Sequence, residues 1–149
     1  MKPDEEYKLS EVETEEAGKK WKEFCKVYFK FEITSKKMPT FADSDYEIFV
    51  NGEFNHFLEV KKRRNTLNHY DQTKIPLRKH AVAEHWFKEK GYKTFFLAIF
   101  TDCIGVVPIY KEPDAVKKMI ARYDRGNDED TYALYDVSKI KKICGQNLK

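Results

Sequence analysis

The residues HFLEVKKRRN, at positions 56–65, read as the end of a strand that runs into a burst of positive charge. Side chains alternate between the two faces of a strand. Glu59 and Lys61 therefore point to one face, while Val60 between them points to the other. A carboxylate and an ammonium group on the same face of an otherwise apolar strand indicate a candidate functional site.

A hairpin is predicted where residues 45–50 (DYEIFV) and 53–61 (EFNHFLEVK) flank Asn51-Gly52, which is a strong hairpin signal. The apolar face is expected to hold Tyr46, Ile48, Val50, Phe54, Leu58 and Val60. The opposite face then carries Asp45, Glu47, Phe49, Asn55, Phe57, Glu59 and Lys61. Asp45, Glu59 and Lys61 of this second face converge at one end of the two strands.

The turn of the hairpin controls this pairing. A three-residue loop over residues 50–52, with Gly52 left-handed in a bulge, puts Asp45 and Glu59 on one face. A two-residue Asn-Gly turn would put the two carboxylates on opposite faces. The hydrophobic pattern favours the bulged loop, because register follows the face that is buried.

The rest of the chain alternates between helical and strand patterns. Apolar spacing predicts a helix over about 11–29, and Pro76 and Gly91 mark the ends of a second helix. Residues 62–75 are expected to form a polar loop. Further expected elements are a strand at 31–35, apolar strands at 94–100 and 104–110, a helix at 112–123, a strand at 131–137 and a short helix at 138–146.

This order predicts a single α/β domain over residues 1–149. Its central mixed sheet, an antiparallel meander plus later strands, is expected to be flanked by helices. The core is expected at about residues 11–110, followed by a helix-strand-helix extension at 111–149.

Composition narrows the setting of the protein. The 149-residue chain has three widely spaced cysteines and no apolar run long enough to span a membrane. We therefore expect no disulfide framework, no membrane association and a reducing, cytoplasmic location.

Positive charge is concentrated in residues 61–79, where seven bases stand against the single acid Asp71. The bases are Lys61, Lys62, Arg63, Arg64, Lys74, Arg78 and Lys79. Such a stretch predicts a phosphate-contacting surface, and a solvated loop is the simpler alternative.

Two carboxylates and a lysine at the ends of neighbouring strands suit metal-assisted phosphodiester hydrolysis. Asp45 and Glu59 can hold Mg²⁺, which prefers oxygen ligands, and the carbonyl of Val60 lies between them as a third candidate ligand. Lys61 can orient the attacking water and stabilise the transition state. Asp43, two residues before Asp45 on the same face, is the alternative ligand.

Asp45, a hairpin and then Glu59-Val60-Lys61 resemble the PD-(D/E)XK nuclease superfamily. The predicted elements over about residues 11–100 follow the order of its restriction-endonuclease-like core. Within the superfamily the chain resembles small phage and archaeal enzymes of the Holliday-junction-resolvase kind. Ser44 stands where the superfamily often has a proline.

The resemblance implies an endonuclease that depends on Mg²⁺, with Mn²⁺ able to substitute, and that acts on DNA. It makes branched or junction DNA a candidate substrate, and a homodimer and a phage-encoded protein acting in the host cytoplasm are further expectations. It also implies a metal-ligating glutamate from the first helix, for which Glu16 and Glu23 are the candidates.

Two other interpretations of the sequence stay open. The chain can be a nuclease-fold module that binds nucleic acid or protein without cleaving. It can also be a structural domain whose Glu59 and Lys61 form a surface ion pair, worth about 0–1 kcal/mol. His80 and His85 are five residues apart, which does not suit two ligands on one helical face. We therefore expect no zinc site and a surface position for His80.

Overall fold

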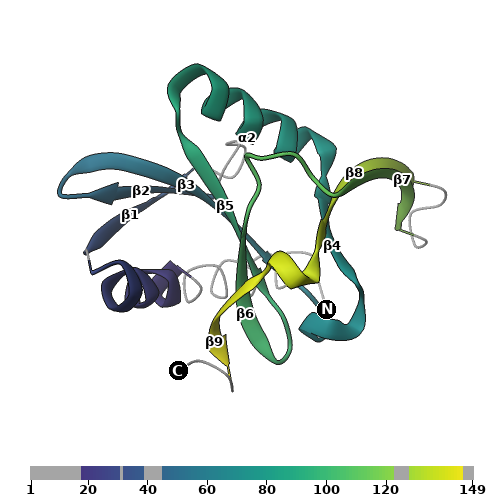
Figure 1. Cartoon of the computed structure of the whole chain (residues 1–149), viewed down its shortest axis with the longest axis horizontal. Helices are drawn as coiled ribbons and strands as arrows, with labels where there is room; N and C mark the ends of the chain where they lie inside the picture. Colours follow the sequence, from purple (N-terminus) through teal and green to yellow (C-terminus); the bar gives the residue numbers. More distant parts are fainter. Residues whose placement is uncertain (1–17, 31, 39–44, 123–127, 146–149) are drawn as a thin grey trace, which may run out of the picture.

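The structure is a computed structural model that describes residues 18–30, 32–38, 45–122 and 128–145. Its larger sheet has the strand order β1-β2-β3-β5-β6-β9 (Figure 1). These strands span Ile33–Lys37, Tyr46–Val50, Glu53–Lys62, Lys93–Ile99, Cys103–Pro108 and Lys141–Gly145. A smaller sheet has the order β4-β8-β7, with bounds Gln72–Pro76, Asp128–Asp136 and Ala115–Arg122.

Helices cover both faces of the larger sheet. Residues 18–24 form an α-helix that continues as the π-helical turn η1 (Cys25–Phe29), and we call residues 18–29 the N-terminal helix. It lies on one side of the sheet, and α2 (Leu77–Lys90) lies on the other (Figure 1). Two short 3₁₀ turns, η2 (Leu67–His69) and η3 (Val137–Lys139), complete the described elements. Among the described residues, no helix is long and apolar enough to cross a membrane.

The larger sheet is mixed, as the sequence predicts. β3 pairs with β5 in parallel, while the other neighbours pair antiparallel. The chain leaves β3, forms β4 and α2, and returns beside β3 as β5. Phe96 and Ala98 of β5 pack into the cluster under α2, whereas Leu97 packs under the N-terminal helix. This confirms a single α/β domain whose central strand is buried on both faces.

The ends of α2 are where Pro76 and Gly91 predict them. Pro76 immediately precedes the helix, and Gly91 follows it with a φ of 73°. The amide of Gly91 donates a hydrogen bond of 2.9 Å to the carbonyl of Phe87. A left-handed glycine after the last turn caps the helix, because glycine adopts this conformation without a Cβ clash.

The hairpin turn differs from the predicted three-residue loop. Asn51 and Gly52 have φ values of 53° and 80°, and Val50 pairs with Glu53, so the turn has two residues. This pairing changes register between Ile48 and Phe49. The prediction of a bulge in the turn is therefore wrong.

The predicted faces of the strand ends are nevertheless correct, because the bulge lies inside the hairpin, although the pairing is two residues away from the one that a three-residue loop would give. Ile48 pairs with His56 and Phe49 pairs with Phe54, which leaves Asn55 as the extra residue. One extra residue on one strand moves all later pairs by one position. Tyr46 consequently pairs with Leu58, as the buried pattern requires.

The bulge also moves one side chain, that of Phe54, to the face opposite the expected one. Phe54 was expected on the apolar face with Leu58, but its ring packs 4.8 Å from Phe57 and 4.7 Å from Tyr92, on the other face. His56 takes the core position and is 3% exposed. The indole Nε1 of Trp21 donates a hydrogen bond of 3.0 Å to His56 Nε2, which satisfies this buried ring nitrogen.

The second half of the chain contains more strands than predicted. The expected loop at 62–75 contains η2 and most of β4, which pairs with β8 through Ile75 and Ala133. The expected helix at 112–123 is instead the edge strand β7. Its residues AVKKMIAR favour helices intrinsically, but pairing with β8 overrides that weak preference.

The expected short helix at 138–146 is also wrong. This segment contains the end of η3 and then β9, which pairs antiparallel with β6 at the edge of the larger sheet. Ile143 is 5% exposed and joins the cluster under the N-terminal helix. Burial of one side chain against the sheet decides the structure of a segment too short to show a helical period.

Candidate active site

Asp45 lies immediately before β2 and is held by the backbone of β3. Its Oδ2 accepts a hydrogen bond of 2.7 Å from the amide of Val60. Tyr46 pairs with Leu58 in antiparallel strands, so Asp45, the residue before Tyr46, lies opposite Glu59, the residue after Leu58. The structure thus places Asp45 beside Glu59, at neighbouring strand ends.

Glu59 is largely buried under α2. Its side chain is 14% exposed, and its Oε1 lies 3.2 Å from Nζ of Lys79. Lys79 comes from the first turn of α2 and is itself only 28% exposed. Helix α2 therefore brings a cation against the carboxylate face of the hairpin.

The two carboxyl groups share one electrostatic environment. Burial and then the Asp45 charge raise the pKa of Glu59 to about 7, against the opposing effects of Lys79 and Lys61. Burial also raises the pKa of Asp45, against the hydrogen bond from Val60 and the charges of Lys79, Lys61 and Lys37. Two partly desolvated carboxyls next to one another favour the binding of a cation, because a cation offsets their repulsion.

Lys61 and Val60 lie on opposite faces, as strand alternation predicts. Val60 is 8% exposed and packs in the cluster under the N-terminal helix. Lys61 is exposed, and its charge acts on both Asp45 and Glu59. The predicted trio of two carboxylates and one lysine is therefore assembled on the α2 face of the sheet.

A third carboxylate does not join this trio within the described part of the chain. Glu16 and the alternative ligand Asp43 lie outside the described residues. Glu23 is exposed on the N-terminal helix, where its carboxylate lies 3.6 Å from the ammonium of Lys20. No cluster of three or more His, Cys, Asp or Glu side chains suited to a metal ion occurs among the residues described.

A comparison with protein families matches residues 6–143 to the family described as "Phage putative PDDEXK endonuclease". The chain belongs to this family. The match covers the hairpin, the N-terminal helix, α2 and both sheets, so it is not confined to the Glu59-Val60-Lys61 motif. No curated protein and no solved structure shows significant similarity to the chain.

Membership in a PD-(D/E)XK endonuclease family gives the carboxylate pair a chemical context. Enzymes of this class generally use divalent metal ions, and an endonuclease family implies a DNA substrate. The six-stranded mixed sheet with helices on both faces is consistent with a PD-(D/E)XK core. The motif residues stand at the ends of two strands of that core.

The predicted DNA-contacting basic residues fall into three groups, which are exposed residues, a member of the carboxylate cluster and residues with internal contacts. Lys62 and Arg64 are exposed at the end of β3 and in the turn after it. Arg78 is exposed, and one guanidinium nitrogen lies 3.2 Å from the carboxylate of Asp130. Lys79 lies against Glu59, so it belongs to the active-site cluster rather than to an outer surface.

Arg63 and Lys74 lie deeper than the other bases. The guanidinium of Arg63 donates a hydrogen bond to the carbonyl of Lys74 and lies 5.5 Å from the ring centre of Phe96. The ammonium of Lys74 lies 4.7 Å from the ring centre of Tyr132. Both cations therefore make internal contacts, and the sequence alone did not separate them from the exposed bases.

A pocket of about 680 Å³ opens beside this group. Its lining includes Lys62, Arg63, Arg64, Lys74 and Lys117. Asp45, Glu59 and Lys61 are not part of its lining, so the pocket is a separate cavity next to the carboxylate cluster. Lys117 comes from β7, the segment that sequence patterns assigned to a helix, and its place in this pocket was therefore missed.

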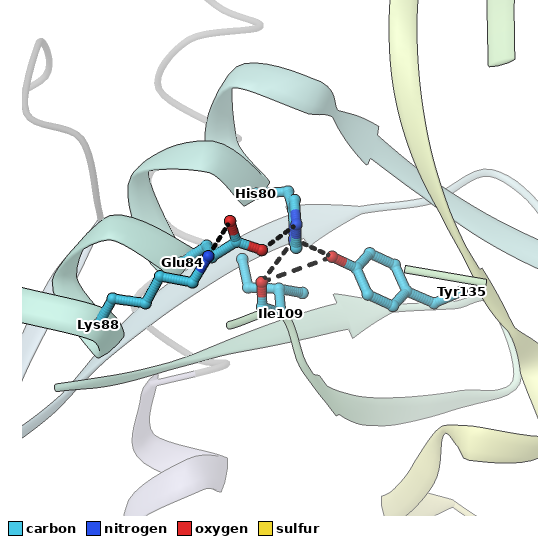
Figure 2. A network of polar contacts seen from close by, with 5 residues as sticks. All are labelled: His80, Glu84, Lys88, Ile109 and Tyr135. Carbon is cyan, nitrogen blue, oxygen red and sulfur yellow. Dashed lines mark hydrogen bonds and ion pairs between the residues drawn. The ribbon is translucent and has the colours of Figure 1, made fainter. Parts of the chain in front are cut away.

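His80 is buried, which corrects its expected surface position. It is 6% exposed, and Figure 2 shows it between Glu84 and Tyr135. His80 Nδ1 lies 2.9 Å from both the carbonyl of Ile109 and the hydroxyl of Tyr135, and Nε2 lies 3.4 Å from Glu84. These contacts join α2 to β8 and to the residue after β6, so His80 helps to fix the position of the helix that carries Lys79.

Proposed function

We propose that this family member is a Mg²⁺-dependent endodeoxyribonuclease, with Mn²⁺ able to substitute, that hydrolyses phosphodiester bonds in branched or junction DNA. One observation carries the proposal. Asp45 and Glu59 form a pair of partly desolvated carboxyls on adjacent strands, with Lys61 on the same face. The junction preference rests on the resemblance to Holliday-junction-resolvase-like enzymes.

The donor set of the cluster fits a hard divalent cation. Asp45, Glu59 and the carbonyl of Val60 would hold the ion, and Glu16 is the further candidate ligand. All of these donors are oxygen atoms, which Mg²⁺ prefers, and Mg²⁺ commonly keeps several waters beside one or two carboxylates. When bound, the ion would supply an acidified water and neutralise charge on the phosphate.

The protein's own cations would act on the same reaction. Lys61 would orient the attacking water and stabilise the charge that develops on the phosphoryl oxygens. Lys79 holds Glu59 in place through an ion pair of 3.2 Å and reduces the negative charge that DNA must approach. Strands and a capped helix position these groups more rigidly than loops would.

The basic residues next to the cluster would bind the DNA backbone. Lys62 and Arg64 are exposed at the end of the strand that carries the motif and just after it, and Arg78 is exposed in the first turn of α2. A homodimer would supply two active sites, which cutting two DNA strands requires, and twofold pairing is the commonest oligomeric state.

The test is cleavage of supercoiled plasmid, linear duplex and a four-way junction, each with Mg²⁺, Mn²⁺ or EDTA. We expect metal-dependent cleavage that is fastest on the junction. Asp45→Ala and Glu59→Ala should lower the cleavage rate by roughly three decades or more, as expected when several kcal/mol of transition-state stabilisation are lost. Glu53→Ala is the matched control, because Glu53 is an exposed acid on the same strand.

DNA affinity in EDTA separates catalysis from binding. Asp45→Ala and Glu59→Ala should bind DNA as well as the parent protein or better, because two negative charges near the phosphate are removed. Circular dichroism would show that both variants are folded. A parent protein that binds DNA but never cleaves would favour the non-catalytic binding module. Variants that cleave like the parent would locate any activity outside this cluster.

A further inference from the structure

The basic pocket lies where the motif strand ends. Lys62 is the last residue of β3 and stands next to Lys61 of the proposed active site. The walls come from the turn after β3, η2, β4, β7 and β8. DNA held at the active site would therefore pass this pocket. The inference about the ligand of the pocket rests on the proposed function.

The charge of the lining suits a phosphate. Five of its residues are bases, Lys62, Arg63, Arg64, Lys74 and Lys117, whereas Asp71 is the single acid in the lining. Burial and then the neighbouring Arg63 charge lower the pKa of Lys74, and burial lowers the pKa of Arg63. Two like charges held close together are stabilised when an anion binds between or beside them.

The lining also offers exposed aromatic and apolar side chains beside the charged ones. Tyr70 is 60% exposed and Met119 is 37% exposed, and both line the pocket. An aromatic ring beside a cationic groove is the arrangement on which single-stranded nucleic acids stack their bases. Bases inside a duplex are already stacked and do not offer a face to a tyrosine.

The size of the pocket points the same way. A volume of about 680 Å³ lies within the range of roughly 300–1,000 Å³ that is typical of small-molecule sites. A duplex, whose major groove alone is about 12 Å wide, cannot enter such a cavity. One or two nucleotides of a single strand can.

We infer that this pocket binds a short single-stranded segment of DNA, with its phosphates on the basic lining and a base stacked on Tyr70. Within the branched DNA of the proposed function, the preferred substrate is then one that carries a single-stranded segment beside the bond to be cut. Blunt duplex would contact the exposed basic side chains outside the pocket and leave the pocket empty.

Binding in EDTA tests this inference without any need for cleavage. The measurement is fluorescence anisotropy with labelled hexathymidylate, a blunt hairpin duplex, and the same duplex with a thymidine overhang. The variants are Tyr70→Ala, Tyr70→Phe and Lys117→Gln. Lys90→Gln is the matched control, because Lys90 is an exposed lysine at the far end of α2. Thermal unfolding of each variant checks the fold.

We expect Tyr70→Ala to weaken hexathymidylate binding by roughly 5- to 150-fold, the equivalent of about 1–3 kcal/mol of stacking. Tyr70→Phe should bind like the parent, since it keeps the ring. Lys117→Gln should reduce the salt slope for the single strand by about 0.7, one phosphate contact. The blunt duplex should bind all variants equally, and thymidylate should compete for the pocket better than inorganic phosphate.

Several results would overturn the inference. Hexathymidylate binding that is unchanged in Tyr70→Ala would show that no base stacks there. An equal loss of blunt-duplex binding would show that the pocket contacts duplex DNA. Equal competition by thymidylate and inorganic phosphate would show that the pocket binds only a phosphate ion. A protein that binds single strands through Tyr70 but cleaves no DNA would refute the proposed nuclease and leave the pocket assignment intact.

Discussion

The two faces of β3 have opposite tasks. On the face toward the N-terminal helix, His56, Leu58 and Val60 are each less than a tenth exposed. On the face toward α2, the same strand passes from the aromatic contacts of Phe57 to Glu59 and then to Lys61. Strand alternation lets neighbouring residues serve a packed core and a charged cluster without a change of backbone.

Each face treats an ionisable group differently. His56 lies in the core, where burial and then the Lys93 charge lower its pKa to about 4, so it is held neutral. Glu59 lies under α2 with a pKa raised to about 7, so it is poised between its two protonation states. The core face thus excludes charge, whereas the α2 face retains charge that a cation can stabilise.

One truncation on each face of β3 tests the contrast between the two faces most directly. Leu58→Ala should lower the free energy of unfolding by about 3 kcal/mol, because Leu58 is fully buried and its loss leaves a cavity. Lys61→Ala should change stability by less than about 0.5 kcal/mol, because the side chain is exposed. Its cleavage rate should nevertheless fall by roughly three decades.

Urea unfolding and single-turnover cleavage measure the two quantities on the same variants. Metal binding by Lys61→Ala should persist, since its carboxylates remain, and its DNA affinity should fall only slightly. A Lys61→Ala variant that unfolds as easily as Leu58→Ala would show that the α2 face is also structural. Full cleavage by the folded Lys61→Ala variant would remove this lysine from the mechanism.

The sequence predicts the carboxylate pair because the relevant contacts are local. Asp45 and Glu59 belong to one hairpin, and the buried positions Tyr46 and Leu58 fix which strand ends meet. The bulge at Asn55 could not be placed, because a bulge in the strand and a bulge in the turn put the same residues of the strand ends on each face. The catalytic roles of the pair stay a prediction.

Contacts between distant segments were less predictable. His80 meets Tyr135 across 55 residues, and nothing in the helical pattern indicates that partner. The ion pair between Lys79 and Glu59 likewise depends on how α2 lies across the sheet. The β7 segment has strong helix formers, and only the ladder with β8 explains its strand. Tertiary partners decided each of these cases.

The pH dependence of stability sharpens the contrast between the faces. The pKa of Glu59 rises to about 7 from 4.5, so the folded protein binds more protons than the unfolded chain in that interval. This contribution to stability is present at low pH and is lost as the pH rises through about 7. His56 acts oppositely, because its pKa falls from 6.5 to about 4 and stability is lost as the pH falls.

Urea unfolding in EDTA from pH about 4 to about 8 resolves the two contributions. Glu59→Gln should gain stability relative to the parent as the pH rises, by up to about 3 kcal/mol at the high end. The free energy of unfolding of Glu59→Gln should then rise with pH, because His56 is held neutral in the folded protein. Glu47→Gln, at a half-buried acid on β2, is the control. A stability difference between Glu59→Gln and the parent that is independent of pH would show that Glu59 titrates normally.

The smallest effect separates two adjacent arginines. Arg64 is exposed, so Arg64→Ala should leave stability within about 0.5 kcal/mol and reduce the salt slope of DNA binding by about 0.9, one phosphate contact. Arg63→Ala should instead lower the free energy of unfolding by about 1–3 kcal/mol, because its guanidinium bonds to the Lys74 carbonyl and lies over Phe96.

Arg63→Lys distinguishes the charge of Arg63 from its packing. Lysine keeps the positive charge but lacks the planar fork, so stability should fall toward that of Arg63→Ala while the salt slope stays near the parent value. Urea unfolding and DNA affinity between low and moderate salt would measure both. An unchanged slope in Arg64→Ala would mean that this turn faces away from DNA. Parent-like stability in Arg63→Ala would show that the contacts of its guanidinium contribute little to the core.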